Sequence, residues 1–270
     1  MIQSAKSLPP RDLIDEPVLY SVYKAWRKMD KSEAFRRIPV EEVSLEAASR
    51  IVLLTDPRSL GADRFRYLRM HLREVRDAAK LRTLVITSAL PREGKSTVAM
   101  NLATALSEGG KKYVLLIEAD LYNPTIASGL GLATGRPGLA ECLEDGIEPI
   151  SVLRWLQPLG WYLLRAGVPK ANPTELSQSE SFPVMIQKLS QYFDWILIDT
   201  PPVAPLSDAL AFSRVADATM LVVRADHTPR DAVREAIALI GPKRVLGIIF
   251  NGAESLNRLY AKYSDYYGKK

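Results

Sequence analysis

Short runs of continuous apolar residues, separated by amphipathic stretches, dominate the chain from residue 83 onward. The runs are TLVITSA at 83–89, YVLLIEAD at 113–120, WYLLRAG at 161–167, WILIDTPPV at 195–203, TMLVVRAD at 219–226 and VLGIIFNG at 245–252. Strands without polar interruption that alternate with helices are typical of a parallel sheet covered on both faces. The pattern therefore predicts an α/β fold with three layers, α/β/α, around a mostly parallel central sheet.

Helical periodicity fills the segments between these runs. STVAMNLATALSEGG at 96–110 predicts a helix that ends at Gly109 and Gly110, and further helices are expected at 182–192 and 230–240. Before the first strand, apolar residues recur every three or four positions, which predicts a helix over about residues 61–80. The residues on its apolar face are Phe65, Leu68, Leu72, Val75 and Ala79, and Arg66, Arg69, Arg73 and Arg76 lie on the other face.

The rest of the chain divides around this domain. Residues 1–50 are proline-rich and are expected to form an arm, whose aromatic cluster (Tyr20, Tyr23, Trp26) is either a docking patch or a strap on the domain. Residues 51–255 are expected to form the domain, and residues 256–270 a tyrosine-rich tail.

Composition excludes several classes of protein. Hydrophobic residues make up 47% of the 270 residues, too many for a chain disordered throughout, and the single cysteine, Cys142, excludes a disulfide scaffold. No apolar run approaches the roughly 20 residues of a membrane span, and the polar, proline-rich start is unlike a signal peptide. These features predict a cytoplasmic location. His71 and His227 are isolated, so no zinc site is expected.

The net charge of +5 and the pI near 9.2 suggest nucleic acid or a membrane surface as a partner. Residues 1–82 hold 17 basic and 12 acidic residues, whereas residues 83–270 hold 19 of each. The excess therefore belongs to the arm and to the helix at 61–80, where a solvated helix face is an equally simple interpretation. The domain itself is balanced, so no nucleic-acid partner is expected.

A loop that matches the phosphate-binding pattern G-x-x-x-x-G-K-[ST] follows the first strand and opens a helix. Gly94 allows the backbone to approach a phosphate, and successive N–H groups at the helix N-terminus face the anion. Lys95 is expected to reach the β- and γ-phosphates of ATP, and the Ser96 hydroxyl to hold Mg²⁺. The loop predicts a P-loop NTPase fold, with Ala89 in the first slot and with nucleotide contacts from Pro91, Arg92, Glu93, Gly94, Lys95, Ser96 and Thr97.

Acidic residues end two later strands, where a metal–phosphate site requires them. Asp120 follows Glu118 by two positions, on the same face of its strand, and Asp199 follows four apolar residues in a Walker B arrangement. Asp199 is expected to bind or orient the Mg²⁺ shell, and Asp120 to bind the metal or to take the proton of an acceptor hydroxyl. Asn251, after the last strand, is predicted to touch the base of the nucleotide.

Four of the 11 tyrosines lie in the last 11 residues, interleaved with lysine, serine, aspartate and glycine: Tyr260, Tyr263, Tyr266 and Tyr267. Such tyrosines can stack nucleic-acid bases, or they can serve as accessible phenol hydroxyls beside an ATP-binding domain.

Taken together, these blocks resemble the bacterial tyrosine autokinases (BY-kinases) of capsule and exopolysaccharide systems over about residues 60–270. The resemblance rests on TSALPREGKSTVAMNLATAL, VLLIEADLYNP, RAGVPKANPTEL, FDWILIDTPPVAPLSDA and the tyrosine tail. It implies ATP-dependent phosphorylation of the tail tyrosines of a neighbouring subunit. It also implies ring assembly through an E-x-x-R-x-x-R motif, whose positions are held here by Asp63, Arg66 and Arg69.

The resemblance further implies partners: a membrane protein of the polysaccharide chain-length type that activates the kinase at the inner face of the plasma membrane, and a separate tyrosine phosphatase. Tail phosphorylation adds roughly −1.5 to −2 charges per tyrosine and is expected to dissociate the ring.

Four positions depart from the family pattern: Asp63 stands where glutamate is usual, Arg92 where glycine is, Glu118 where aspartate is, and Tyr122 where arginine is. Glu118 and Tyr122 leave open a second interpretation, a nucleotide-dependent assembly subunit with little kinase activity. A partitioning-type ATPase is disfavoured because Leu90 occupies the slot of that class's extra lysine.

Overall fold

The structure, a computed structural model, describes residues 35–44, 46, 48, 50–169, 172–204 and 207–253. Two compact units divide the chain, Met1–Arg37 and Ile38–Lys270, and every element below belongs to the second. The aromatic cluster of the predicted arm and the four tail tyrosines lie outside the described residues. Among the described helices, none has the length and apolar character needed to cross a membrane.

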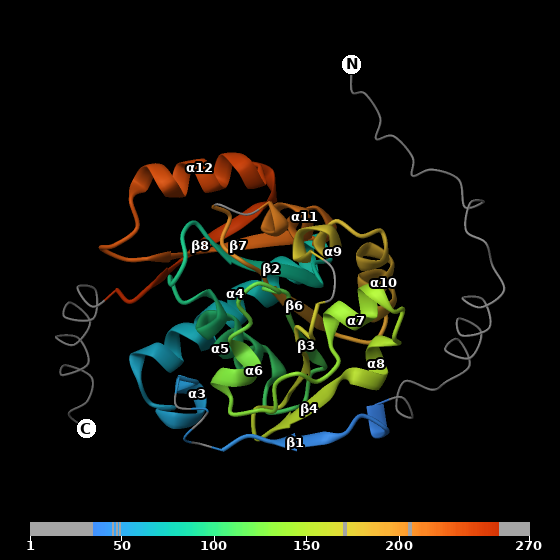
Figure 1. Ribbon diagram of the computed structural model, residues 1–270. Coiled ribbons are helices and arrows are strands. Elements are labelled where there is room, and N and C mark those ends of the chain that lie inside the picture. The colour runs from blue at the N-terminus through green and yellow to red at the C-terminus, as the bar shows by residue number, and fades with distance from the viewer. Residues whose placement is uncertain are drawn as a thin grey trace. The chain divides into compact units, whose positions relative to one another are not determined.

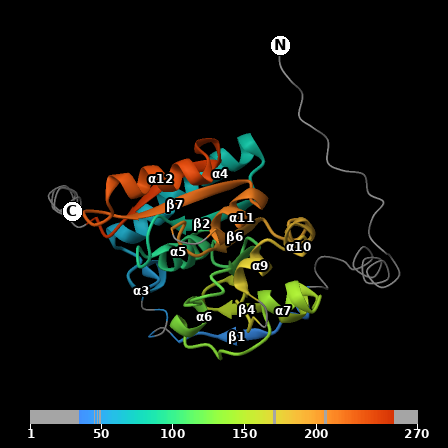
Figure 2. The ribbon, with the colours of Figure 1, turned by 45° about the horizontal axis from the view of Figure 1, so that its top comes forward.

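Eight strands form one sheet in the order β1-β4-β5-β3-β6-β2-β7-β8 (Figure 1). Their bounds are β1 (Val40–Glu42), β2 (Thr83–Ser88), β3 (Val114–Glu118), β4 (Arg154–Gln157), β5 (Trp161–Leu164), β6 (Trp195–Asp199), β7 (Ala218–Arg224) and β8 (Val245–Asn251). All pairs are parallel except β4 with β5, so β1 and β4 run against the other six strands at one edge of the sheet (Figure 2). The prediction of a mostly parallel sheet is confirmed.

The helices connect these strands and cover both faces of the sheet. They are α3 (Val52–Thr55), α4 (Leu60–Ala79), α5 (Lys95–Ser107), α6 (Ile126–Gly129), α7 (Leu139–Glu144), α8 (Pro149–Val152), α9 (Pro173–Ser177), α10 (Ser181–Leu189), α11 (Asp208–Val215) and α12 (Arg230–Ile240), followed by a 3₁₀ turn at Pro242–Arg244. The helices predicted over 61–80, 182–192 and 230–240 are present as α4, α10 and α12.

Strand β7 shows how the two faces are built. Met220 and Val222 point into the core beneath α4 and α5, whereas Leu221 and Val223 point into the core beneath α11 and α12. Side chains of successive strand residues face opposite sides, so a strand between two helical layers has to be apolar at every position. Burial of each such side chain contributes about 1.5–3 kcal/mol to folding.

Helix α5 ends slightly earlier than its glycines suggest. The last helical residue is Ser107, and Glu108 already has a left-handed backbone with φ of 50°, followed by Gly109 and Gly110 at 68° and 89°. The turn therefore begins on a glutamate, which adopts this conformation at a higher cost than glycine.

Two strands, β1 and β4, were not predicted from the sequence. Strand β1 has the sequence VEE and lies within the segment assigned to the arm, and β4 has the sequence RWLQ. Both strands lie toward one edge of the sheet, where some of their side chains are exposed to solvent. Neither therefore shows the continuous apolar pattern of a central strand.

Candidate functional site

The predicted site residues meet at the carboxyl ends of the central strands. The loop after β2 leads into α5, and β6 lies between β2 and β3 in the sheet, with Asp199 in register with Ile86 and Glu118. Asp120 follows β3 directly. In open α/β sheets this edge is where ligands bind. The fold thus brings Lys95, Ser96, Asp120 and Asp199 to one place, although these residues span more than 100 positions.

Lys95 and Asp120 form a close ion pair. Lys95 Nζ donates to Asp120 Oδ2 at 2.8 Å, and the exposed fractions of the two side chains are 12% and 7%. Burial alone would lower the pKa of Lys95, but the carboxylates of Asp199 and Asp120 outweigh it, so the pKa is raised. The lysine is therefore held in its charged form, ready for an anionic ligand.

Asp199 is almost completely buried, and its Oδ1 has no hydrogen-bond partner in the described part of the chain. Burial raises the pKa of this carboxyl to about 7, against the opposing effects of the Lys95 charge and the Ser96 hydroxyl. A buried carboxylate oxygen without a partner is unfavourable unless a cation or donor approaches it. This oxygen, together with the Ser96 hydroxyl, fits a site for Mg²⁺.

The donor set has the character that Mg²⁺ requires in phosphate-binding sites. The described residues contain no cluster of three or more His, Cys, Asp or Glu side chains that would hold a metal by themselves. Mg²⁺ in kinases and ATPases is held by one or two carboxylates together with substrate phosphates and waters. Ser96, Asp120 and Asp199 match that arrangement. Thr125 donates to the Ser96 hydroxyl at 3.3 Å and so orients it.

Gly94 is required at its position for two reasons. Its φ is 86°, and a Cβ there would lie 2.2 Å from Asn251 Nδ2. Asn251 Nδ2 in turn donates to the backbone oxygen of Glu93 at 2.9 Å. The structure thus places Asn251, predicted to touch the base, directly on the phosphate loop. The end of β8 fixes the loop that follows β2.

Glu93 connects the loop to Thr228, a residue that was not among those predicted for the site. Its Oε2 accepts from the backbone N–H of Leu90 at 3.2 Å, and its Oε1 accepts from the hydroxyl of Thr228. Thr228 lies between β7 and α12, 135 positions away, and no local pattern marks it. Next to Glu93, Arg92 is exposed and has a left-handed backbone with φ of 63°.

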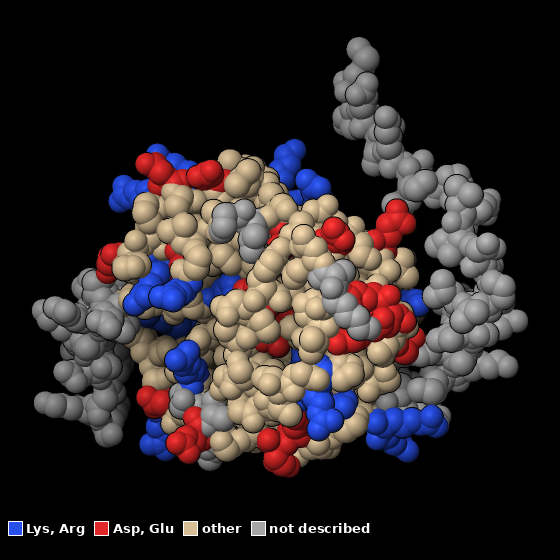
Figure 3. Space-filling model, in the orientation of Figure 1, with Lys and Arg blue, Asp and Glu red and all other residues tan. Residues whose placement is uncertain are grey.

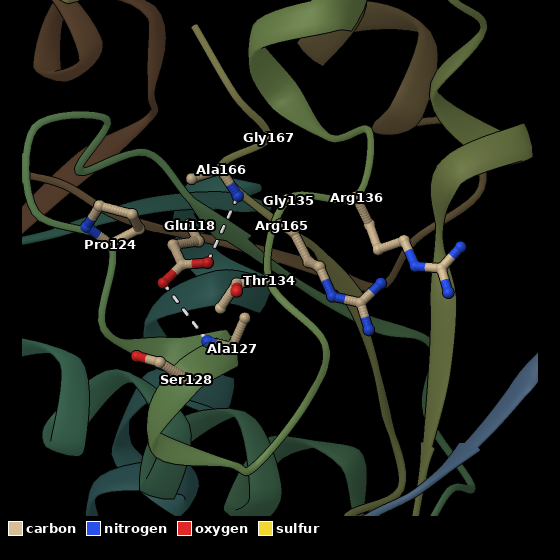
Figure 4. A pocket seen from close by; sticks show the side chains of 10 residues that line it. All are labelled: Glu118, Pro124, Ala127, Ser128, Thr134, Gly135, Arg136, Arg165, Ala166 and Gly167. Carbon is tan, nitrogen blue, oxygen red and sulfur yellow. Dashed lines mark hydrogen bonds between the residues drawn. The ribbon is translucent and has the colours of Figure 1, made fainter.

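Glu118 is engaged by backbone N–H groups. Its Oε1 accepts from the N–H of Ile126 at 2.6 Å. Figure 4 shows its two other bonds, in which Oε1 accepts from Ala127 at 3.4 Å and Oε2 from Ala166 at 3.3 Å. Burial raises the pKa of this carboxyl, and the N–H groups partly oppose the shift. Glu118 therefore joins the start of α6 to the segment after β5, and both of its oxygens are used in doing so.

Tyr122 connects the Asp120 segment to the block RAGVPKANPTEL. Its hydroxyl lies 3.1 Å from Asn172 Oδ1 and 2.9 Å from Thr174 Oγ1. Asn172 also caps α9 by accepting from the backbone N–H of Thr174. The tyrosine thus makes hydrogen bonds at the position where the resemblance led us to expect arginine, and its side chain remains half exposed.

The residues predicted for subunit contact lie together on α4. Arg66 pairs with Asp63 at 2.7 Å and donates to the backbone oxygen of Pro57, and Arg69 contacts the backbone oxygen of Ala105 at 3.4 Å. Tyr67 and Met70 are exposed beside them. This face of α4 combines arginines with apolar side chains, which is the composition of many subunit contacts.

Comparison with known proteins identifies the family. The ParA family model, described as NUBPL iron-transfer P-loop NTPase, matches residues 81–268. Tyrosine-protein kinase YwqD of Bacillus subtilis (strain 168) is 32% identical over 225 residues, 82% of this chain and 92% of YwqD. The succinoglycan biosynthesis transport protein ExoP of Rhizobium meliloti (strain 1021) is 33% identical over 84% of this chain but only 29% of ExoP.

Among solved structures, the BceF tyrosine kinase domain has a TM-score of 0.68 and 28% identity, covering 86% of this chain and 96% of that domain. These matches span the phosphate loop, the carboxylates and the central sheet, and they confirm the resemblance seen in the sequence. The chain therefore belongs to the bacterial tyrosine-protein kinases, enzymes built on the P-loop NTPase fold.

Proposed function

We propose that this kinase transfers the γ-phosphoryl group of ATP to its own C-terminal tyrosines, Tyr260, Tyr263, Tyr266 and Tyr267, in a neighbouring copy within a ring. The observation that carries the proposal is the convergence of the phosphate loop, the Lys95–Asp120 pair and the unpartnered oxygen of Asp199 at one edge of the sheet. The tyrosines near the C-terminal end of the same chain supply the acceptor hydroxyls.

Each residue has a role that follows from its chemistry. Lys95 and the backbone N–H groups at the start of α5 bind the phosphates. Ser96 and Asp199 would hold Mg²⁺, which would supply positive charge beside the phosphate oxygens. When Lys95 turns to the phosphates, its bond to Asp120 opens. Asp120 is then available to take the hydroxyl proton as the tyrosine oxygen attacks the γ-phosphorus and ADP leaves.

The proposed setting is exopolysaccharide or capsule synthesis. The relative ExoP carries the words biosynthesis and transport in its name and is much longer than this chain, which aligns with 29% of it. We therefore place this kinase at the inner face of the plasma membrane. There it is recruited and activated by a membrane protein of a polysaccharide export system, and a separate tyrosine phosphatase reverses its modification.

The direct test is incubation of the full chain with Mg-ATP and a cytoplasmic fragment of the activator, followed by mass spectrometry of the tail. Phosphate is expected on tyrosines 260–267 in the wild type, whereas Lys95→Met and the fourfold Tyr→Phe variant of the tail remain unmodified. A wild type that binds ATP but gains no phosphotyrosine would exclude autophosphorylation.

One observation favours a second candidate function, a nucleotide-dependent assembly subunit with little kinase activity. Both oxygens of Glu118 are engaged by backbone N–H groups, so this acid is not free to assist at the metal. This alternative predicts that ATP changes the mass of the assembly, measured by light scattering, while the tail stays unmodified. Phosphorylation that disappears in Lys95→Met removes it.

A further inference from the structure

Three arginines converge beside the antiparallel edge of the sheet, and none of them belongs to the phosphate loop. Arg165 directly follows β5, Arg154 begins the neighbouring strand β4, and Arg136 lies in the loop before α7. Figure 4 shows the side chains of Arg136 and Arg165 next to each other at a hollow that Glu118 also lines. A second hollow is lined by all three arginines together with Glu41 of β1.

In the second hollow, the three guanidinium groups face a single carboxylate, that of Glu41. Arg165, with 4% of its side chain exposed, pairs with Glu41, and its buried Nε has no partner in the described residues. Arg154 donates to the backbone oxygen of Leu153 at 2.7 Å. For Arg136, the part of the chain that the structure describes offers no hydrogen bond or ion pair. Burial, Arg165 and Arg136 lower the pKa of Arg154 against the opposing effect of Glu41.

The charges of these side chains do not balance: three guanidinium groups against one carboxylate leave a local charge of +2. Like charges in a partly buried place repel each other more strongly than in water, and a buried N–H without an acceptor adds a further cost. Figure 3 shows basic side chains low on this face, over β4. An anion with two charges would remove both penalties.

We propose that Arg136, Arg154 and Arg165 form a binding site for a doubly charged oxyanion of the phosphate type, separate from the phosphate loop. The planar guanidinium group presents paired N–H donors that match phosphate oxygens, and charge-assisted bonds of this kind are strong. Glu41 occupies part of Arg165 and leaves Arg136, most of Arg154 and the Nε side of Arg165 for the ligand. The site stands on these side chains alone and does not depend on the proposed reaction.

The test measures the thermal midpoint of unfolding of the full chain against inorganic phosphate, with Mg-ADP present and with NaCl holding the ionic strength constant. Phosphate is expected to raise the midpoint saturably, and Arg136→Ala/Arg154→Ala is expected to weaken this response at least tenfold in concentration. The matched control is Arg230→Ala/Arg234→Ala, which removes two arginines from α12 and should keep the response. Any phosphate that binds at the phosphate loop raises the midpoint equally in all variants, so it does not affect the difference between them.

A second readout observes the site directly. In the ¹H–¹⁵N spectrum of arginine side chains, the Nε–H signal of Arg165 is expected to move on addition of phosphate in the wild type but not in Arg136→Ala/Arg154→Ala. Equal thermal responses in all three proteins, or an Nε–H signal that does not move, would overturn the proposal.

Two sources supply this chemistry, free phosphate and a phosphate ester, and a titration with phenyl phosphate separates them. Tighter binding of phenyl phosphate than of inorganic phosphate assigns the site to an aryl phosphate ester, and the reverse order assigns it to the free anion. Failure of both probes to bind refutes the site, whatever the outcome of the kinase assay.

Discussion

Arg92 has the least favourable backbone in the phosphate loop. Its φ of 63° lies in the left-handed region that favours glycine, the residue that the resemblance led us to expect here, and its side chain is exposed. A residue with a Cβ pays about 1–2 kcal/mol for this conformation. The loop keeps the conformation because its neighbours are fixed: Glu93 by Leu90 and Thr228, and Gly94 by its contact with Asn251.

Replacement of Arg92 by glycine is therefore expected to raise the free energy of unfolding by up to about 1 kcal/mol, because glycine adopts this φ without strain but loses more entropy on folding. Urea unfolding measures the change. Arg92→Ala is the matched control, since it removes the charge and keeps the strain. If Arg92→Gly is less stable than Arg92→Ala, the backbone at residue 92 is not strained.

Because of Asp199, the free energy of unfolding of the nucleotide-free protein is expected to depend on pH. Because its folded pKa, about 7, lies above the ordinary value of 3.8, the buried group stabilises the fold fully below about pH 4. That contribution, on the order of a few kcal/mol, is lost as pH rises from about 4 to about 7.

The free energy of unfolding of wild type minus that of Asp199→Asn is expected to fall across this range. Asp231→Asn, at an exposed position on α12, serves as the control and should change the profile little. Chemical unfolding at pH 4.5, 6.0 and 7.5 makes the comparison. A wild-type advantage that is constant with pH would show that Asp199 ionises normally in the folded state.

At the scale of elements, Glu118 fastens α6 to the end of β3 and to the segment after β5. Glu118→Asp shortens the side chain by one methylene, so it cannot reach Ile126 and Ala166 together, and a loss of about 1–3 kcal/mol in the free energy of unfolding is expected. Glu118→Gln keeps the length and one acceptor oxygen, so its loss should be smaller. Urea unfolding compares the two variants. Equal losses in the free energy of unfolding would show that the length of the side chain is not the cause.

The sequence predicted those elements whose residues are buried on both sides. All five residues of β3 and all six of β2 are buried, and their apolar runs were sufficient to place them. Strand β1, with two glutamates in three residues, is held by pairing with β4 rather than by burial. Pairing leaves no mark in a hydrophobicity pattern, so β1 could not be found this way, whereas β8, at the other edge of the sheet, was found because most of its residues are apolar.

The same limit applies to the site. Lys95 could be selected from the phosphate-loop pattern, and Asp120 and Asp199 because each ends an apolar run. Thr228 and Arg165 could not, because their roles depend on distant residues, Glu93 in one case and Glu41 in the other. The hydrogen bond from the Ala166 N–H to Glu118 likewise depends on how the chain folds, and it was not predicted.

At the scale of the whole molecule, assembly is expected to depend on α4. Arg66→Ala/Arg69→Ala removes the pair with Asp63 and leaves the phosphate loop untouched, so assembled mass should fall while ATP binding is retained. Light scattering and nucleotide titration measure the two properties. Arg230→Ala/Arg234→Ala controls for the loss of two charges. An unchanged mass in the α4 variant would assign this face of the helix to another contact.

The contact between Asn251 and the phosphate loop fixes the start of the segment that carries the proposed acceptor tyrosines. The last residue of β8 touches Glu93, and Tyr260 follows nine positions later, which limits its distance from Asn251 to about 30 Å of extended chain. A tether of that length gives Tyr260, one of the proposed acceptors, an effective concentration in the millimolar range near its own loop. Phosphoryl transfer between copies therefore competes with transfer within one copy, which does not slow down on dilution. A phosphorylation rate per molecule that rises with protein concentration indicates transfer between copies, and a constant rate indicates transfer within one copy.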